Sequence, residues 1–368
     1  MKRGFWKVIG RRAGLVCMLA GAGMAVWAQA PEGPQPTSSA PQDPAQAQKP
    51  ATPQQEKPKE AGVTISVDVP VVTLDVVAAT QNGDIIPGLK RENFRILEDG
   101  QPQVITNFGT TEAPITVVIL MEFSNVSGGW FSAYAKYWAE ALFPNLNQKD
   151  WVALVTFDMK PRMEVDFTQN KDEVREAIYR LFVPGFSESN IFDALLDTSD
   201  RMKDVKGKKA ILVLASGRDT FSKHTLDQTM KKLRGSDTTI FVVGVDRPLT
   251  NWMDSHNRLS GARHLDYLQA ENQMKAFAEM TGGHAWFPQF DGELPGVMRE
   301  VAAFLRHQYS LSYSPSNPSQ DGKFRKIKVE LVAPDGGPLT VTDQKGKKQK
   351  IVVYTREGYQ PVKNGVGD

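Results

Sequence analysis

The sequence predicts an α/β protein built on a doubly wound, mostly parallel sheet, with flanking antiparallel β segments that form a β-sandwich. Three observations lead to this prediction. Short apolar runs alternate with helical patterns through the middle of the chain, runs with period-two alternation occupy both flanks, and a proline-rich N-terminal region lacks large apolar side chains. With 368 residues, 40% of them hydrophobic, the chain is long enough for two folded units.

Residues 1–30 have the three parts of an export signal. A positively charged region comes first, the stretch 13–27 is almost wholly apolar, and Ala28-Gln29-Ala30 is a small-x-small cleavage site. We therefore expect a signal peptide and a secreted, periplasmic or cell-envelope location. An uncleaved membrane anchor is the alternative, although the apolar run is short for a spanning helix. The single cysteine, Cys17, would leave with the signal, so neither disulfides nor cysteine catalysis is expected.

Residues 31–62 are interpreted as a tether. Eight of these 32 residues are proline and six are glutamine, with no aromatic side chain and no aliphatic one larger than alanine. Such a segment cannot bury a core, so we expect a disordered, partly extended linker before the folded part. A proline-rich recognition motif is the functional alternative.

Two flanking segments, residues 63–110 and 309–360, have β patterns. In the first, "VTISVDVPVVTLDVVAAT" alternates apolar and polar residues, and "LKRENFRILEDGQPQVITNF" indicates a strand, an Asp-Gly hairpin turn and another strand. In the second, strand-like runs are divided by Pro, Asn and Gly turns. Neither segment offers many strands alone. We predict that the two pack together as one β-sandwich into which the central part is inserted.

Residues 114–308 have the alternation of a doubly wound domain. The runs "ITVVILM", "WVALVTF", "KAILVLAS" and "TTIFVVGV" are typical of strands in a parallel sheet covered on both faces. Helical patterns occur at 131–142, 171–181, 191–202, 226–233 and 273–280, the last before a strand-like "HAWF". Ligands of such sheets bind at the carboxyl ends of the strands. The stretch "EFSNVSGG" follows the first run, so we expect it at that edge.

Charge and motifs exclude several classes of function. The 44 basic and 42 acidic residues leave a net charge of +2, which gives no basis for a nucleic-acid partner. There is neither a Gly-x-x-x-x-Gly-Lys-Ser/Thr phosphate loop nor a dinucleotide fingerprint after the first central strand. A hydrolase that uses Ser216 is a remote alternative, because no sequence feature places a histidine beside this serine. We expect no catalytic residues and no enzyme activity.

Six segments of the chain carry a family resemblance. They are "GDIIPGLKRENFRILEDGQPQVITNF", "VVILMEFSNVS", "SNIFDAL", "AILVLASGRD", "FAEMTGGHAWFP" and a tail that begins "YSLSYSPSN". In order and spacing they resemble von Willebrand factor A domain proteins, in particular the bacterial secreted family described as VWFA-related Acidobacterial domain proteins. The resemblance implies an A-type α/β fold and a metal-ion-dependent adhesion site. In such a site oxygens from three loops hold a divalent ion, and a partner's carboxylate completes its coordination.

On the first of these loops, the sequence departs from the family's Asp-x-Ser-x-Ser pattern. Glu122 stands where Asp is expected, so the carboxylate remains but is one methylene longer. Ser124 matches the first Ser. Val126 stands at the second Ser position and offers no oxygen, which leaves Ser127, one residue later, as the substitute ligand if the loop bulges.

The resemblance also places ligands on two further loops. Ser189 falls at the Thr position, and Ser216 replaces the Asp of the third loop, with Asp219 nearby as a compensating carboxylate if that loop rearranges. Two outcomes stay open. Either these oxygens still hold Mg²⁺ or Mn²⁺, or the domain keeps its fold without a metal and binds its partner through loop surfaces.

Residues 246–273 are predicted to be a long connection, which makes them a candidate partner surface. The expected contact residues are Trp252, His256, Arg258 and Arg263. A lid that only covers the edge of the sheet is the alternative.

The sequence therefore predicts a secreted, tethered protein of the adhesion type with a degenerate metal site. It would mediate protein-protein interaction with an unknown protein or cell-envelope partner, through loops at the carboxyl edge of the sheet. Contact with a membrane is expected only through the signal or the tether. A metal-free structural scaffold of the cell envelope is the competing prediction.

Overall fold

The computed structural model describes residues 71–110, 114–124, 137–138, 141–181, 186–258, 260–342 and 345–361. The predicted export signal and linker lie outside the described residues, and so do positions 63–70 of the predicted N-terminal β segment. Residues 66–368 belong to one compact unit. Within the described part of the chain, no helix is long and apolar enough to cross a membrane.

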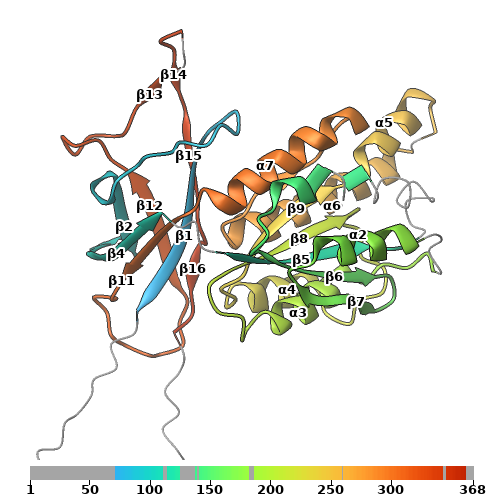
Figure 1. The fold of residues 1–368 in the computed structure, drawn as a ribbon, viewed down its shortest axis with the longest axis horizontal. Coiled ribbons are helices and arrows are strands. Elements are labelled where there is room, and N and C mark those ends of the chain that lie inside the picture. Colours follow the sequence, from blue (N-terminus) through green and yellow to red (C-terminus); the bar gives the residue numbers. More distant parts are fainter. Residues whose placement is uncertain are drawn as a thin grey trace, which may run out of the picture. The chain divides into compact units, whose positions relative to one another are not determined.

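The flanking segments form two four-stranded sheets that share one apolar core (Figure 1). One sheet has the order β15-β1-β11-β4 and the other has the order β16-β12-β2-β3. Leu74 and Leu311 from the first sheet lie in the same buried cluster as Ile96 and Ile327 from the second. The strands are β1 (Val72–Thr80), β2 (Phe94–Glu98), β3 (Gln101–Gln103), β4 (Ile105–Thr110), β11 (Tyr309–Tyr313), β12 (Arg325–Leu331), β15 (Ile351–Tyr354) and β16 (Gly358–Tyr359).

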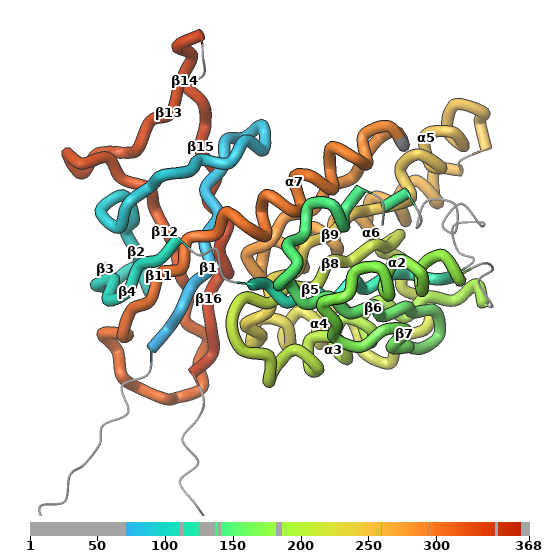
Figure 2. The backbone as a smooth tube through the Cα atoms, in the orientation of Figure 1, coloured from blue at the N-terminus to red at the C-terminus, as the bar shows by residue number. Residues whose placement is uncertain are grey.

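Each sheet of this sandwich combines strands from both ends of the folded chain. β1 pairs antiparallel with β11 along its first half and with β15 along its second half, while β2 pairs antiparallel with β12. The chain leaves the sandwich after β4 and returns to it at β11 (Figure 2). The predicted insertion into a β-sandwich is confirmed. A separate hairpin of β13 (Val341–Thr342) and β14 (Lys348–Gln349) follows β12.

The central sheet has six strands in the order β10-β9-β8-β5-β6-β7. Its strands are β5 (Ile115–Glu122), β6 (Trp151–Phe157), β7 (Pro161–Thr168), β8 (Lys208–Ala215), β9 (Thr239–Gly244) and β10 (Ala285–Trp286). All pairings are parallel except that of the edge strand β7 with β6, which has two register shifts. The sequence analysis missed β7, since only Val165 of this strand is buried and its apolar alternation is weak.

Helices cover both faces of the central sheet, as predicted for a doubly wound domain (Figure 1). One apolar cluster contains side chains of α2 (Lys171–Arg180) and α7 (Leu294–Arg306). The other contains side chains of α3 (Ile191–Arg201), α4 (Leu226–Leu233) and α6 (Gly261–Met280). All eight residues of β5 are buried, because alternate side chains enter the two clusters.

The prediction of a long connection at 246–273 is wrong. This stretch contains α5 (Arg247–Ser255) and the first part of α6, which begins twelve residues before the predicted helix at 273–280. No residue of α5 is buried, and α6 has no buried residue before Ala270. The sequence of α6 lacks a clear apolar stripe over its twenty residues, and α5 has only nine residues, too few for a helical period to stand out. Helix α7 was also not predicted, and the predicted helix at 131–142 is described only at 137–138 and 141–142, which are helical.

The two ends of the inserted domain are joined by one buried carboxylate. Asp150, whose side chain is fully buried, accepts the backbone N–H of Ile115 at the start of β5 at 3.1 Å. It also accepts the N–H of Asn147 at 2.7 Å and forms an ion pair with Arg306 at the end of α7. This carboxylate links the first strand of the insert, β5, to its last helix, α7.

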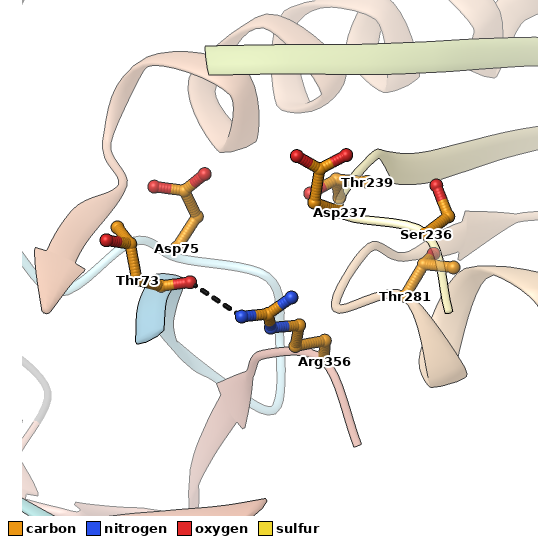
Figure 3. A pocket seen from close by; sticks show the side chains of 7 residues that line it. All are labelled: Thr73, Asp75, Ser236, Asp237, Thr239, Thr281 and Arg356. Carbon is orange, nitrogen blue, oxygen red and sulfur yellow. Dashed lines mark hydrogen bonds between the residues drawn. The ribbon is translucent and has the colours of Figure 1, made fainter. Parts of the chain in front are cut away.

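A small polar cavity of about 30 Å³ lies where β1 meets the loop before β9. Figure 3 shows the carboxyl groups of Asp75 and Asp237 at this cavity with the guanidinium of Arg356, which donates to the carbonyl oxygen of Thr73 at 2.9 Å. Burial raises the pKa of Asp75, against the attraction of Lys208 and Arg356. The cavity is polar and has the volume of about one or two waters.

Candidate functional site

The first candidate residue, Glu122, is the last residue of β5 and is only 2% exposed. Its Oε1 accepts the hydroxyl of Ser124 at 2.7 Å, and its Oε2 accepts the backbone N–H of Ser216 at 2.7 Å. Because β5 and β8 are parallel neighbours, their carboxyl ends meet at one edge and bring Glu122 beside Ser216. The sequence analysis anticipated this pairing of loops.

The surroundings of Glu122 favour its neutral form. Burial raises the pKa of this carboxyl, the nearby Asp246 carboxylate raises it further, and hydrogen bonds from Ser124 and Ser216 act in the opposite direction. A carboxylate that ligates a metal must be deprotonated. Both oxygens of Glu122 already accept a protein donor, so a cation would have to displace the Ser124 hydroxyl or the Ser216 N–H.

Ser189 lies just before α3 and is completely buried. Its backbone carbonyl accepts the N–H groups of Thr220 and Phe221 at 2.8 and 3.0 Å, which ties the loop after β8 to the start of α3. Its hydroxyl oxygen has no hydrogen-bond partner among the described residues. This oxygen therefore has room in its bonding for a further ligand or water.

Asp219 accepts hydrogen bonds from the start of α3 and from its own loop. Its Oδ1 accepts the hydroxyl of Ser222 at 2.5 Å and the N–H of Phe192 at 3.4 Å. Burial raises the pKa of this carboxyl, while the hydrogen bonds from Ser222 and Phe192 lower it. The carboxylate therefore stabilises the first turn of α3, where anionic groups are favoured.

These observations test whether the residues fit a divalent ion. Mg²⁺ demands an octahedron of oxygens with carboxylate charge. The described residues supply Glu122, whose two oxygens accept protein donors, Asp219, whose donors belong to α3 and its own loop, and Asp246, which lies beside the Arg218 guanidinium. Among the described residues, no group of three His, Cys, Asp or Glu side chains is placed to hold a metal ion. Val126 and Ser127 lie outside the described residues, and the donor set that is described does not fit Mg²⁺ or Mn²⁺.

Two residues that the sequence analysis did not select complete this edge. Asp246 follows β9, is 6% exposed and lies 3.4 Å from the guanidinium of Arg218, which follows β8. The Arg218 guanidinium is centred 5.1 Å over the ring of Tyr267. The sequence does contain a signal for these two residues. Arg218 comes shortly after the apolar run "AILVLAS" and Asp246 directly after "TTIFVVGV", just as Glu122 comes at the end of the first apolar run of the domain.

The predicted partner residues lie on α5, on α6 and between them. Trp252 is 41% exposed, and its ring centroid lies 4.7 Å from that of His256 and 5.2 Å from the Arg258 guanidinium. These three residues form one cluster, which we name the Trp252 cluster. Arg263 is exposed in the first turn of α6, where its backbone N–H donates to Ser260 Oγ at 3.4 Å.

The remote prediction of a Ser216 nucleophile has no support in the geometry. Ser216 is 2% exposed, and its hydroxyl oxygen accepts the backbone N–H of Arg218 at 3.3 Å. His224 bonds instead to Asp193 at 2.7 Å and approaches Lys232 Nζ at 2.8 Å. Burial lowers the pKa of His284 to about 4, and this ring packs against Trp286, Phe304 and Tyr354. No described histidine is within hydrogen-bonding reach of Ser216.

Comparison with known proteins identifies the central domain. Residues 117–279 match the family model of the von Willebrand factor type A domain. Domains of this type are mostly binding and adhesion domains rather than enzymes. No curated protein has a significant match to the sequence. The family match confirms the resemblance at the level of the domain, while the narrower secreted family remains a prediction.

Several solved structures are similar to parts of the chain at low sequence identity. The von Willebrand factor type A protein of Catenulispora acidiphila is 12% identical, with a TM-score of 0.41 over 77% of this chain and 73% of that one. The vWF domain of the type V pili tip protein Mfa5 of Porphyromonas gingivalis is 12% identical, with a TM-score of 0.39 over 52% and 95%. The conserved hypothetical protein BatB of Bacteroides thetaiotaomicron is 12% identical, with a TM-score of 0.37 over 52% and 98%.

Proposed function

Because residues 117–279 form a von Willebrand factor type A domain, which is a protein-interaction domain, we propose that this chain is a secreted binding protein of the cell envelope. It holds a protein or envelope partner through the carboxyl edge of the central sheet, without a metal ion. The export signal predicted for residues 1–30 and the tether predicted for 31–62 support this location.

One observation carries the metal-independent part of the proposal. The two oxygens of Glu122 accept the Ser124 hydroxyl and the Ser216 N–H, both at 2.7 Å. In this arrangement Glu122 joins the end of β5 to the start of the loop after β8 through hydrogen bonds that need no cation. The partner then meets a surface of side chains, in which Arg218 and the Trp252 cluster supply positive charge and aromatic area.

Two equally exposed tryptophans allow a matched test. Trp252 is 41% exposed beyond the carboxyl end of β9, and Trp151 is 43% exposed at the amino end of β6. The full-length chain, Trp252→Ser and Trp151→Ser would be used to capture cross-linked proteins from an envelope fraction of the producing cell, each with and without EDTA. We expect Trp252→Ser to lose the partner roughly tenfold, as for an interface hot spot, and Trp151→Ser and EDTA to have no effect.

Two results would contradict the proposal. Loss of the partner with EDTA would show a metal-dependent adhesion site. Equal capture by all three proteins would support the structural scaffold of the envelope, which needs no ligand surface at this edge.

A further inference from the structure

Three arginines at the carboxyl edge of the sheet have their guanidinium groups over aromatic rings. Arg218 lies 5.1 Å from the ring centroid of Tyr267, Arg247 lies 5.5 Å from that of Phe287, and Arg258 lies 5.2 Å from that of Trp252. Stacking of this kind holds the guanidinium plane in place and leaves its N–H edge available for hydrogen bonds. The three arginines can therefore be compared by the carboxylate partner that each guanidinium has.

Two of the three guanidinium groups have a carboxylate partner within the chain. Arg218 lies 3.4 Å from Asp246, and Arg247 donates to both oxygens of Glu271 at 2.6 and 2.7 Å. The Arg247 pair is the bidentate geometry in which guanidinium and carboxylate groups bind most strongly.

Arg258 differs from the other two. Among the described residues, no carboxylate lies within 4.0 Å of its guanidinium, although Asp254 is only four positions away in the sequence. Trp252, on which it stacks, is also the most exposed of the three aromatic partners. The Trp252 cluster thus presents a cation and an aromatic surface to solvent, and the counter-charge is missing from the described chain.

The backbone holds Arg258 in this position. Asn257 has a φ of +54°, the left-handed conformation that commonly ends a helix. The N–H of Asn257 donates to the carbonyl of Asp254 at 2.9 Å, and the N–H of Arg258 donates to that of Met253 at 2.8 Å, which is the Schellman arrangement. His256 Nδ1 lies 2.8 Å from the carbonyl oxygen of Trp252. A surface that is already ordered loses little conformational entropy when a ligand binds.

We propose that the Trp252 cluster is a receptor for a carboxylate side chain of the partner protein, next to an apolar residue that packs on the indole. The partner's carboxylate binds the guanidinium of Arg258 in the way that Glu271 binds the guanidinium of Arg247 over Phe287. This inference rests on the proposed function and gives the chemistry of the partner segment, which is an acidic residue flanked by apolar ones.

The test uses a peptide and its uncharged isostere. Acetyl-Leu-Glu-Leu-amide and acetyl-Leu-Gln-Leu-amide would be titrated to millimolar concentration into the ¹⁵N-labelled full-length chain while the indole N–H signals are recorded. The Trp252 signal is assigned with Trp252→Phe. We expect the Glu peptide to shift this signal and to bind roughly tenfold more tightly than the Gln peptide, the preference that one charge-assisted pair provides.

Two arginine variants separate a specific contact from general charge. Arg258→Gln should abolish the preference for the Glu peptide, whereas Arg234→Gln should keep it, because Arg234 is an exposed arginine that follows α4 and lies over the ring of Phe324, away from the Trp252 cluster. The unchanged indole signals of the other tryptophans would show that both variants are folded. Equal binding of the two peptides, the same preference in Arg258→Gln, or no shift of Trp252 with either peptide would overturn the inference.

The capture experiment distinguishes this inference from the proposed function. If Trp252→Ser loses the partner and Arg258→Gln retains it, the binding edge is correct and the carboxylate receptor is wrong. If both variants lose it and Trp151→Ser does not, both proposals are supported. If neither loses it, the proposed function itself fails.

Discussion

The backbone N–H of Ser216 donates to Oε2 of Glu122 across the carboxyl ends of two neighbouring parallel strands, at 2.7 Å. The family pattern has an acidic ligand at the position of Ser216. In this chain Ser216 instead donates its backbone N–H to Glu122, which stands at the first acidic position of the pattern. The relationship makes Glu122 a hydrogen-bond acceptor that joins two loops, and it leads to a specific expectation for its substitution.

Glu122→Gln should be tolerated, whereas Glu122→Leu should not. The Gln carbonyl can accept the Ser216 N–H, and its amide can donate to the Ser124 hydroxyl, so we expect a change within about 1 kcal/mol in the free energy of unfolding. Leucine leaves the buried Ser216 N–H without an acceptor, at a cost of about 1–3 kcal/mol. Urea unfolding of the three proteins measures both values. A cost for Gln as large as that for Leu would mean that the charge of Glu122 is needed.

Divalent ions should neither bind nor stabilise the chain. Titration of Mg²⁺ or Mn²⁺ to millimolar concentration should give no heat by calorimetry, and it should leave the melting temperature unchanged, since a bound ligand stabilises a fold by mass action. Glu122→Gln and Ser124→Ala serve as controls. Binding to the unsubstituted chain that both controls lose would establish a metal site built from these oxygens and would contradict the metal-free proposal.

His284 should make the protein less stable in mild acid. Burial of the His284 ring among aromatic rings lowers its pKa in the folded protein to about 4, below the value of about 6.5 expected in the unfolded chain. As pH falls from 6.5 to 4, the unfolded chain binds a proton at this site and the folded chain does not, so stability is lost in that window. We expect a loss of about 2 kcal/mol, allowing for partial exposure of the ring.

His284→Phe provides the comparison for this pH dependence. The variant cannot bind a proton at this position, so its unfolding free energy should fall less between pH 7 and pH 4 than that of the parent. Urea unfolding at both pH values gives the difference. An identical pH dependence in the two proteins would show that other groups cause the acid sensitivity.

The cavity in Figure 3 should show coupling between Arg356 and Asp75. Arg356→Met removes the bond to the Thr73 carbonyl and a positive charge that attracts Asp75, so we expect a loss of about 1.5–3 kcal/mol in the free energy of unfolding. In Asp75→Asn the buried carboxylate is absent, and the cost of losing Arg356 should be smaller by at least about 1 kcal/mol. A double-mutant cycle by urea unfolding measures this coupling. Additive costs would mean that the two side chains act independently.

Most of the sheet could be predicted because its strands are buried on both faces. β5, β6, β8 and β9 are continuous apolar runs, and only a sheet covered on two sides needs them. β7 lies at the edge of the same sheet with one buried side chain and was missed. The helices that were found bury a regular stripe, whereas the nine-residue α5 has only partly buried and exposed side chains. Local pattern therefore predicts an element only where burial is periodic.

For the candidate site, the sequence implied through its family resemblance that the loops after β5 and β8 contribute to one site, and the pairing of β5 with β8 brings them together. It did not predict that the Ser216 N–H bonds Glu122, that Asp219 turns to the start of α3, or that Asp246 and Arg218 lie at the same edge. Each of these depends on side-chain directions in loops, where no repeating pattern relates sequence to geometry.

The sequence by itself determined the fold class and the inserted arrangement of the sandwich. These features follow from hydrophobic periodicity. Apolar side chains must be buried, so their spacing along the sequence indicates which segments form strands and helices. Only the tertiary structure decided that Glu122 accepts protein donors and that Arg258 stacks on Trp252 without a carboxylate from the described chain. Hydrogen bonds and ion pairs form over about 3 Å between residues far apart in sequence, so the packing of the whole domain sets them.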